Sequence, residues 1–350
     1  MNEHLNWLLY PWNFELMATS EIENAEEGIM DTTDTRQVFK ATAFFILTTI
    51  SIPANIFVFC AFLRTFVIEG KLMTADIILC HLAFVNLLVA LTRSIPQTMA
   101  AFGYKNMLDD VGCKLTMFSF RIFRGLSISL TCLLSTYQAV LVSPATSRLA
   151  PLKSRIPQYL KHIIVILYVI YCVSNCNAPI SAVASFPNNT IPPYTFNLQF
   201  CFVTFPNYIG FISGGLVNFF GDLLFIVLMA IMSGYILVLL YKHSKKVRGL
   251  RSSECNQSGA RAEVKASRAV VTLVTLYCLF FGVDNIIYLY SLTVLRVAIF
   301  LSDIRVFFAT LYTSVCPVVV IITNPKVKVK TKMKKQESLS QPTDITTSAV

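Results

Sequence analysis

The sequence predicts an all-α membrane protein built as a bundle of seven transmembrane helices. The composition is the first observation: 55% of the 350 residues are hydrophobic and 14% are charged, whereas an ordinary soluble domain carries roughly a quarter charged residues. The second is the segregation of charge, because residues 162–221 contain no Asp, Glu, Lys or Arg. The third is a series of seven apolar segments, most of them near the roughly 20 residues that a helix needs to cross a bilayer. A water-soluble globule is therefore excluded.

Five segments are clear spanning helices, because each carries at most one charge and satisfies its own backbone hydrogen bonds. They are residues 41–63, 125–147, 162–184, 223–241 and 269–295. Residues 74–92 and 306–325 are shorter or less purely apolar. The span at 125–147 is expected to begin nearer Lys114, since 115–124 is apolar apart from two arginines. Residues 202–221 are long enough to span but contain proline, glycine and asparagine, so we predict that they do not.

The distribution of basic residues predicts the orientation. With seven spans and an outer N-terminus, the inner segments hold 20 Lys and Arg residues and the outer segments 7, as the positive-inside rule requires. We therefore expect an acidic extracellular N-terminus at 1–40, a membrane domain at 41–325 and a basic cytoplasmic tail at 326–350, near anionic lipid. The leader has no apolar run preceded by basic residues, so we expect no cleavable secretion signal.

The cysteines and one glycosylation sequon agree with this orientation. Of the ten cysteines, two fall in outer segments, Cys113 and Cys201, and we expect them to form a disulfide in the oxidising compartment. Asn188 begins an outer Asn-Asn-Thr sequon and is the expected glycosylation site. The four histidines are scattered, and no cluster has the spacing of metal ligands. We expect no metal, no cofactor and no enzymatic activity.

Four ionisable residues lie within or beside the predicted spans at a similar depth in the outer half. Such residues are costly in a bilayer and indicate function by default. We expect them to form the polar floor of a ligand pocket, or alternatively to pair with one another and hold the bundle together. The residues are Arg121, Arg124, Asp222 and Asp284.

Seven spans, an outer N-terminus and a basic third inner segment resemble a G-protein-coupled receptor. Particular strings are similar to the type 1 vomeronasal (pheromone) receptor family, a group of rhodopsin-like architecture. They are IPQTMAAFG at 95–103 before GCK at 112–114, RGLSI at 124–128, TCLLS at 131–135 before QA at 138–139, and KASRA at 265–269.

This resemblance implies a chemosensory receptor for small pheromone-like or odorant molecules that activates an inhibitory-type heterotrimeric G protein. The basic segment at 242–268 then becomes the expected G-protein surface, although its charge also suits simple topology determination. Its candidate contact residues are Lys245, Lys246, Arg248, Lys265 and Arg268.

Some features of the wider rhodopsin-like class are absent. The acid–Arg–aromatic triplet is missing near Tyr137, and Asn86 stands where that class usually has a carboxylate. The activation switch is thus left unassigned. Asn55 resembles the class's asparagine in the first span and is expected to bond towards Asn86. The alternatives are another chemosensory type, such as a bitter-taste-like receptor, and a multi-span transporter, although no internal repeat is seen.

Overall fold

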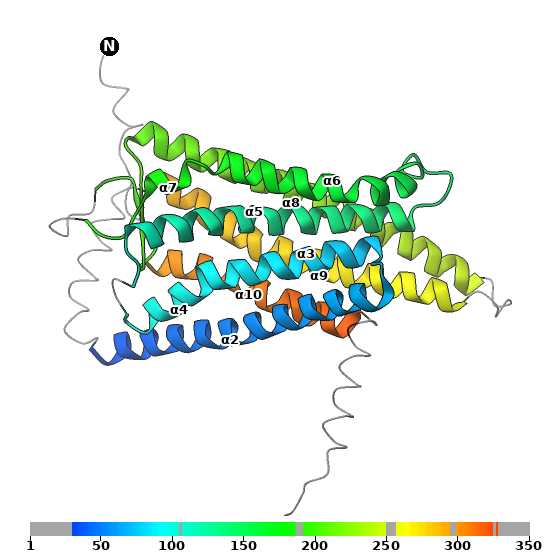
Figure 1. The fold of residues 1–350 in the computed structure, drawn as a ribbon, viewed down its shortest axis with the longest axis horizontal. Helices are drawn as coiled ribbons and strands as arrows, with labels where there is room; N and C mark the ends of the chain where they lie inside the picture. Colours follow the sequence, from blue (N-terminus) through cyan, green and yellow to red (C-terminus); the bar gives the residue numbers. More distant parts are fainter. Residues whose placement is uncertain are drawn as a thin grey trace, which may run out of the picture.

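The computed structural model is a helical bundle that carries a small antiparallel sheet at one end (Figure 1). It describes residues 30–104, 107–186, 192–249, 257–294, 299–324 and 327, with the backbone alone for helical residues 30–35, 243–249, 257–267, 269 and 299. In chain order the elements are α2 (Met30–Glu69), α3 (Thr74–Val89), the π-helix η2 (Ala90–Ser94), α4 (Ile95–Ala101), α5 (Asp110–Val142), α6 (Leu152–Ser174), α7 (Ala178–Ser181), β1 (Ala182–Val183), β2 (Thr195–Asn197), β3 (Phe202–Thr204), α8 (Tyr208–Gly249), α9 (Gln257–Thr293) and α10 (Ile299–Thr323).

The predicted seven-helix bundle is confirmed. Within the described residues, seven helical segments are long and apolar enough to cross a membrane. One of them, Thr74–Ala101, joins α3, η2 and α4. The π-helix lies just before Pro96, whose missing N–H cannot continue the regular hydrogen-bond ladder.

Two predicted boundaries are wrong. Residues 202–221 do not form a span of their own, as predicted, but residues 208–221 are helical and form the first turns of α8, so the span predicted at 223–241 begins earlier. The side chain of Asn218 donates to the carbonyl of Gly214 at 2.8 Å, so this amide N–H is satisfied within the helix. The span predicted at 162–184 ends earlier, since α6 stops at Ser174 and residues 182–183 form β1. The helix count is unchanged.

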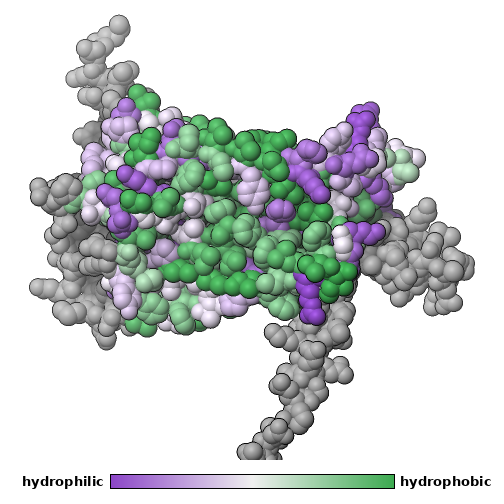
Figure 2. Space-filling model, in the orientation of Figure 1, coloured by the Kyte–Doolittle hydropathy of each residue, from purple (hydrophilic) through white to green (hydrophobic). Residues whose placement is uncertain are grey.

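The helix α5 is the centre of the bundle and packs against α3, α6, α8 and α9. Its apolar side chains Leu126, Ile128, Leu130 and Leu134 are fully buried in the largest core cluster. Helices α6 and α8 are peripheral, with 11% and 17% of their most apolar stretches buried. Figure 2 shows an apolar belt across the middle of the visible face and hydrophilic residues towards both ends, as expected for a surface that faces hydrocarbon.

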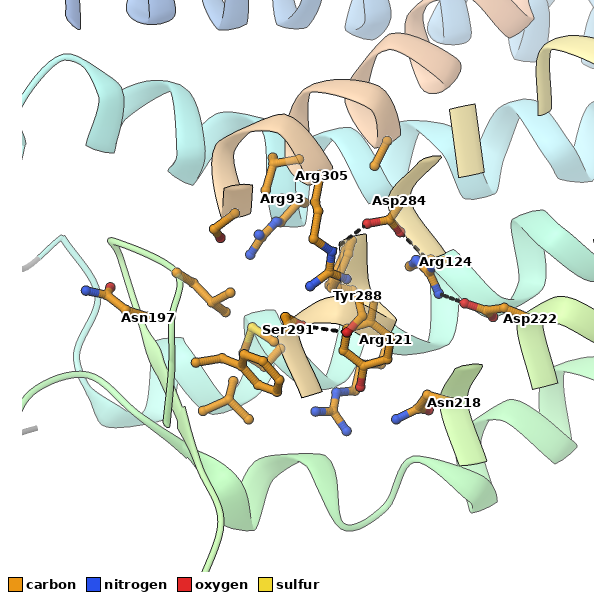
Figure 3. A pocket seen from close by; sticks show the side chains of 18 of the residues that line it. Arg93, Arg121, Arg124, Asn197, Asn218, Asp222, Asp284, Tyr288, Ser291 and Arg305 are labelled. Carbon is orange, nitrogen blue, oxygen red and sulfur yellow. Dashed lines mark hydrogen bonds and ion pairs between the residues drawn. The ribbon is translucent and has the colours of Figure 1, made fainter. Parts of the chain in front are cut away.

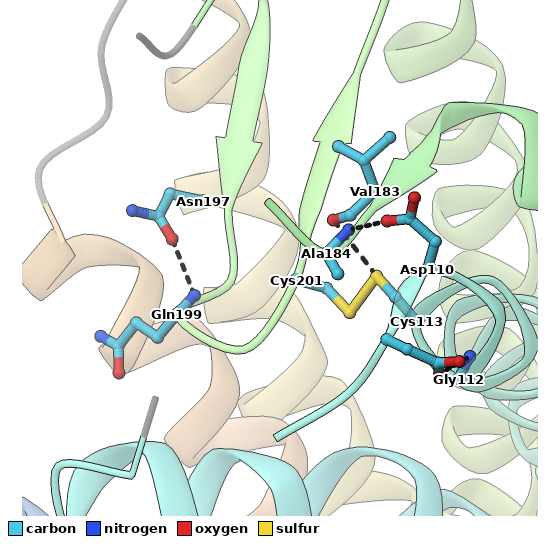
Figure 4. The surroundings of a disulfide bond; sticks show 9 residues. Asp110, Gly112, Cys113, Val183, Ala184, Asn197, Gln199 and Cys201 are labelled. Carbon is cyan, nitrogen blue, oxygen red and sulfur yellow. Dashed lines mark hydrogen bonds between the residues drawn. A yellow bond between two sulfur atoms is a disulfide. The ribbon is translucent and has the colours of Figure 1, made fainter. Parts of the chain in front are cut away.

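The antiparallel strands β2 and β3 form a hairpin, and β1 pairs with the other edge of β3. A disulfide joins Cys113 of α5 to Cys201, with a Cα–Cα distance of 5.9 Å (Figure 4). The carboxylate of Asp110 accepts a hydrogen bond of 2.8 Å from the backbone N–H of Ala184. These links fasten the sheet across one end of the bundle, which we call the hairpin end.

A hydrogen bond expected in the scaffold is absent. The side chain of Asn55 donates to the carbonyl of Thr313 in α10 at 3.0 Å, whereas the amide oxygen of Asn86 accepts from the hydroxyl of Ser127 at 2.7 Å. The prediction of a bond from Asn55 towards Asn86 is therefore wrong, because Asn55 bonds to α10 and Asn86 bonds to α5.

Candidate functional site

A cavity of about 920 Å³ lies at the hairpin end. Its walls come from η2, α5, α6, α8, α9 and α10, and residues of β2, β3 and the adjoining chain form its roof (Figure 3). Small-molecule pockets in proteins have volumes of roughly 300–1,000 Å³. The cavity is thus large enough for a small organic ligand.

A ladder of ion pairs crosses the cavity floor. Arg124 of α5 contacts Asp222 of α8 at 2.6 Å (Nη1 to Oδ2) and Asp284 of α9 at 3.0 Å (Nη2 to Oδ2). The other oxygen of Asp284 accepts from Nε of Arg305 in α10 at 2.8 Å. The side chain of Asp284 is 5% exposed. The ladder therefore links four helices, and the nearly buried carboxylate of Asp284 joins three of them.

Two further arginines line the cavity without a carboxylate partner. Among the described residues, neither Arg93 nor Arg121 takes part in an ion pair. Arg93 is buried in η2, between the rings of Phe120 and Phe200, each 5.3 Å from its guanidinium carbon. Arg121 points into the lower part of the cavity in Figure 3, near Asn218.

The lining residues of the cavity carry an excess of positive charge. Four arginines (93, 121, 124 and 305) face two aspartates (222 and 284), and arginine stays protonated in proteins. The ladder uses two of the arginines to neutralise both carboxylates. The lining of the cavity therefore has a net charge of two guanidinium groups, which favours binding of an anion.

Aromatic rings support the roof of the cavity on one side. Phe196 of β2 packs against Phe211 of α8 at 5.1 Å and against Tyr288 of α9 at 6.1 Å between ring centroids. A polar cluster fastens the other side. Gln199, at the tip of the hairpin, donates to Asp303 at 3.0 Å and accepts from Lys40 at 3.0 Å.

The structure places the four charged residues predicted for the pocket in the wall of one cavity. Three of them, Arg124, Asp222 and Asp284, pair with one another, as the bundle-holding alternative requires. Arg121 does not. Sequence reasoning missed Arg93 and Arg305, because both lie near the ends of apolar segments and were counted with the outer loops.

The remaining predicted sites lie elsewhere or outside the described residues. Cys113 and Cys201 form the expected disulfide. Asn188 lies outside the described residues. Lys245, Lys246 and Arg248 belong to α8, and Lys265 and Arg268 belong to α9, at the end of the bundle opposite the hairpin. Of these, Arg268 has a described side chain, and it is exposed. The described residues contain no group of three or more potential metal ligands.

Comparisons with known proteins agree on one family. A model described as the vomeronasal organ pheromone receptor family matches residues 38–333. The chain is 40% identical over 306 residues to the olfactory receptor class A-like protein 1 of Danio rerio, covering 87% of this chain and 95% of that protein. It is 27% identical over 330 residues to the vomeronasal type-1 receptor 1 of Gorilla gorilla gorilla, covering 92% and 86%.

A solved structure supports the fold. Squid rhodopsin superposes with a TM-score of 0.65 at 18% identity, with 89% of each chain covered. The chain therefore shares the fold of squid rhodopsin.

Proposed function

Because the chain belongs to the vomeronasal organ pheromone receptor family, we propose that it detects small, negatively charged organic molecules in the cavity at its hairpin end. The family and the rhodopsin-like fold make the chain a G-protein-coupled chemosensory receptor and a multi-pass protein of the plasma membrane. Membership of this family excludes the two alternatives, a bitter-taste-like receptor and a transporter.

The charge of the cavity supports the ligand class. Arg93 and Arg121 line it without a carboxylate partner among the described residues. At an effective dielectric constant of 20, a guanidinium attracts an anion about 4 Å away by about 4 kcal/mol. A neutral molecule of the same shape gains nothing from this term. An organic carboxylate or sulfate therefore fits the cavity better than an alcohol or an amide does.

The size and lining of the cavity support a small ligand with an apolar body. Phe120, Phe196 and Tyr288 contribute aromatic surface, and Met117 and Val203 contribute aliphatic surface. Pockets of this kind bind the ligand body by apolar contact and fix its orientation through a few polar groups.

The experiment for the ligand class is calcium imaging of cells that express the receptor with a promiscuous G protein. Matched pairs are applied: benzoate with benzamide, octanoate with octanamide, and phenyl sulfate with phenol. The proposal predicts responses to anionic members at concentrations where the neutral partners are silent. Responses confined to neutral members, or equal responses within each pair, would contradict it.

We propose that the hairpin end faces the exterior, with residues 1–40 extracellular and residues 326–350 cytoplasmic. The excess of basic residues in the inner segments supports this orientation, as does the disulfide, which forms in an oxidising compartment. An antibody tag at residue 1 should bind on intact cells and a tag at residue 350 after permeabilisation. The variant Asn188→Gln should lose the mass shift that a glycosidase produces.

We propose coupling to an inhibitory-type G protein at the opposite end, through the basic ends of α8 and α9. The resemblance to the receptor family is the support for this subtype. In cells without the promiscuous G protein, ligand should lower cyclic AMP, and pertussis toxin should abolish the effect. A rise in cyclic AMP that is insensitive to the toxin would contradict the proposed subtype.

A further inference from the structure

Arg93 has an unusual environment for a charged group. Arg93 is 7% exposed, and its Nη1 atom has no hydrogen-bond partner among the described residues. The rings of Phe120 and Phe200 flank the guanidinium, which offsets part of the cost of removing it from water. None of the described carboxylates forms an ion pair with this guanidinium. A buried cation without a directly bonded anion is expensive, so this position suits an anion that is not part of the chain.

Arg305 of α10 presents a second guanidinium to the same region. Its carbon lies 4.5 Å from the centroid of the Tyr288 ring, and its Nε is used by Asp284. Within the described part of the chain, its two Nη groups make no hydrogen bond. Arg93 lies within electrostatic range of Arg305 and also of Asp284 and Asp303. Figure 3 draws Arg93 and Arg305 at the upper side of the cavity.

We propose that the anionic group of the ligand binds between Arg93 and Arg305, and that it competes there with Asp284 for Arg305. This inference rests on the proposed function, because it assigns a position to the anion within the same cavity. A planar carboxylate or a tetrahedral sulfate accepts two or more hydrogen bonds from such forked donors. Each oxygen then bonds to a guanidinium that the chain leaves partly unused.

The other two arginines of the cavity fit this role less well. Arg124 already uses both of its Nη groups in ion pairs with Asp222 and Asp284, whereas Arg305 pairs through its Nε. Arg121 is partly exposed, and it lies towards Asn218 on the other side of the cavity (Figure 3). Solvent screens its attraction to an anion more strongly than that of a buried guanidinium. Arg121 would contact the opposite end of the ligand.

Competition with Asp284 gives the binding event a structural consequence. Asp284 joins α9 to both α5 and α10. An anion that draws Arg305 away weakens the bond between α9 and α10 and leaves the bond to α5. Bound ligand thereby favours a different position of α9, as two-state receptors require of an agonist.

The test uses the full-length receptor purified in detergent, with thermal unfolding as the readout. Sodium benzoate and sodium sulfate are the probes, with benzamide and sodium chloride at equal ionic strength as controls. We expect both probes to stabilise the wild type. Arg93→Gln and Arg305→Gln should each weaken the apparent affinity for benzoate by about 10- to 100-fold, the value of one lost charged hydrogen bond. Arg121→Gln should weaken it by less than about 5-fold.

Two further variants separate the proposal from misfolding. Arg305→Lys retains the charge but loses the fork, so it should bind benzoate with intermediate affinity. Arg155→Gln, at an exposed position at the start of α6, should match the wild type. If Arg121→Gln loses benzoate while Arg93→Gln retains it, the assigned position is wrong and the anionic ligand class stands. If no probe stabilises the wild type, both proposals are overturned.

Discussion

Replacing Asp284 by Asn tests the role of this carboxylate as an internal competitor. The substitution keeps the size of the side chain and removes its charge, leaving the guanidiniums of Arg124 and Arg305 without their shared partner. Breaking a buried pair costs about 3–5 kcal/mol. The side chains of Arg124 and Arg305 are 20% and 24% exposed to the cavity, so solvent lowers this cost, and we expect about 2–3 kcal/mol.

The assay measures thermal unfolding of Asp284→Asn with and without benzoate. Without benzoate, the variant should melt several degrees below the wild type. Its apparent affinity for benzoate should be about tenfold tighter or more, because Arg305 no longer has an internal partner. The matched control is Asp110→Asn, which weakens a hydrogen bond to the backbone of Ala184 outside the cavity wall. A purely structural carboxylate also predicts the loss of stability, so the benzoate affinity is the measurement that discriminates. Equal or weaker affinity in Asp284→Asn would refute the competition.

Three further predictions concern the scaffold. Cys113→Ser should destabilise the receptor by about 2–4 kcal/mol and reduce its surface expression, whereas Cys172→Ser, at an exposed free cysteine, should match the wild type in a flow-cytometry assay. Gly125→Ala should lower the melting temperature, because a Cβ there overlaps the ring of Tyr171 and overpacking costs about 1–3 kcal/mol. Adding Tyr171→Ala to this variant should restore part of the lost stability, and no recovery would contradict the overlap. Tyr235→Phe removes hydrogen bonds from α8 to two serines in the segment that follows α5. Basal signalling in a cyclic AMP assay should therefore rise about 2- to 10-fold, and unchanged basal signalling would exclude Tyr235 as a restraint.

The sequence predicts the fold well because the bilayer imposes simple constraints. Length and apolarity predict seven spans, and the distribution of cysteines predicts the pair Cys113 and Cys201. The ends of the helices are less predictable. Glycine and asparagine predict a break in soluble proteins, yet α8 begins at Tyr208, since neighbouring backbone groups satisfy the polar side chains.

The cavity is predicted in part. Residues 121, 124, 222 and 284 stand out because charge is rare inside a span. Arg93 and Arg305 do not, because a hydropathy count cannot distinguish a charge that points into the bundle from one that reaches solvent at a span end. The π-helix changes which face carries Arg93, and this register shift has no signal in the sequence other than the nearby Pro96. The pairing of charges is likewise a property of the packed helices.

Photolabelling tests most directly the claim that the cavity at the hairpin end binds small organic anions. A benzoate that carries a diazirine is crosslinked to the full-length receptor, and the labelled peptides are identified by mass spectrometry. The account predicts labels on peptides from α5, α9 and α10 that line the cavity, with protection by excess benzoate but not by benzamide. Labels at the opposite end of the bundle, or equal protection by benzamide, would contradict it.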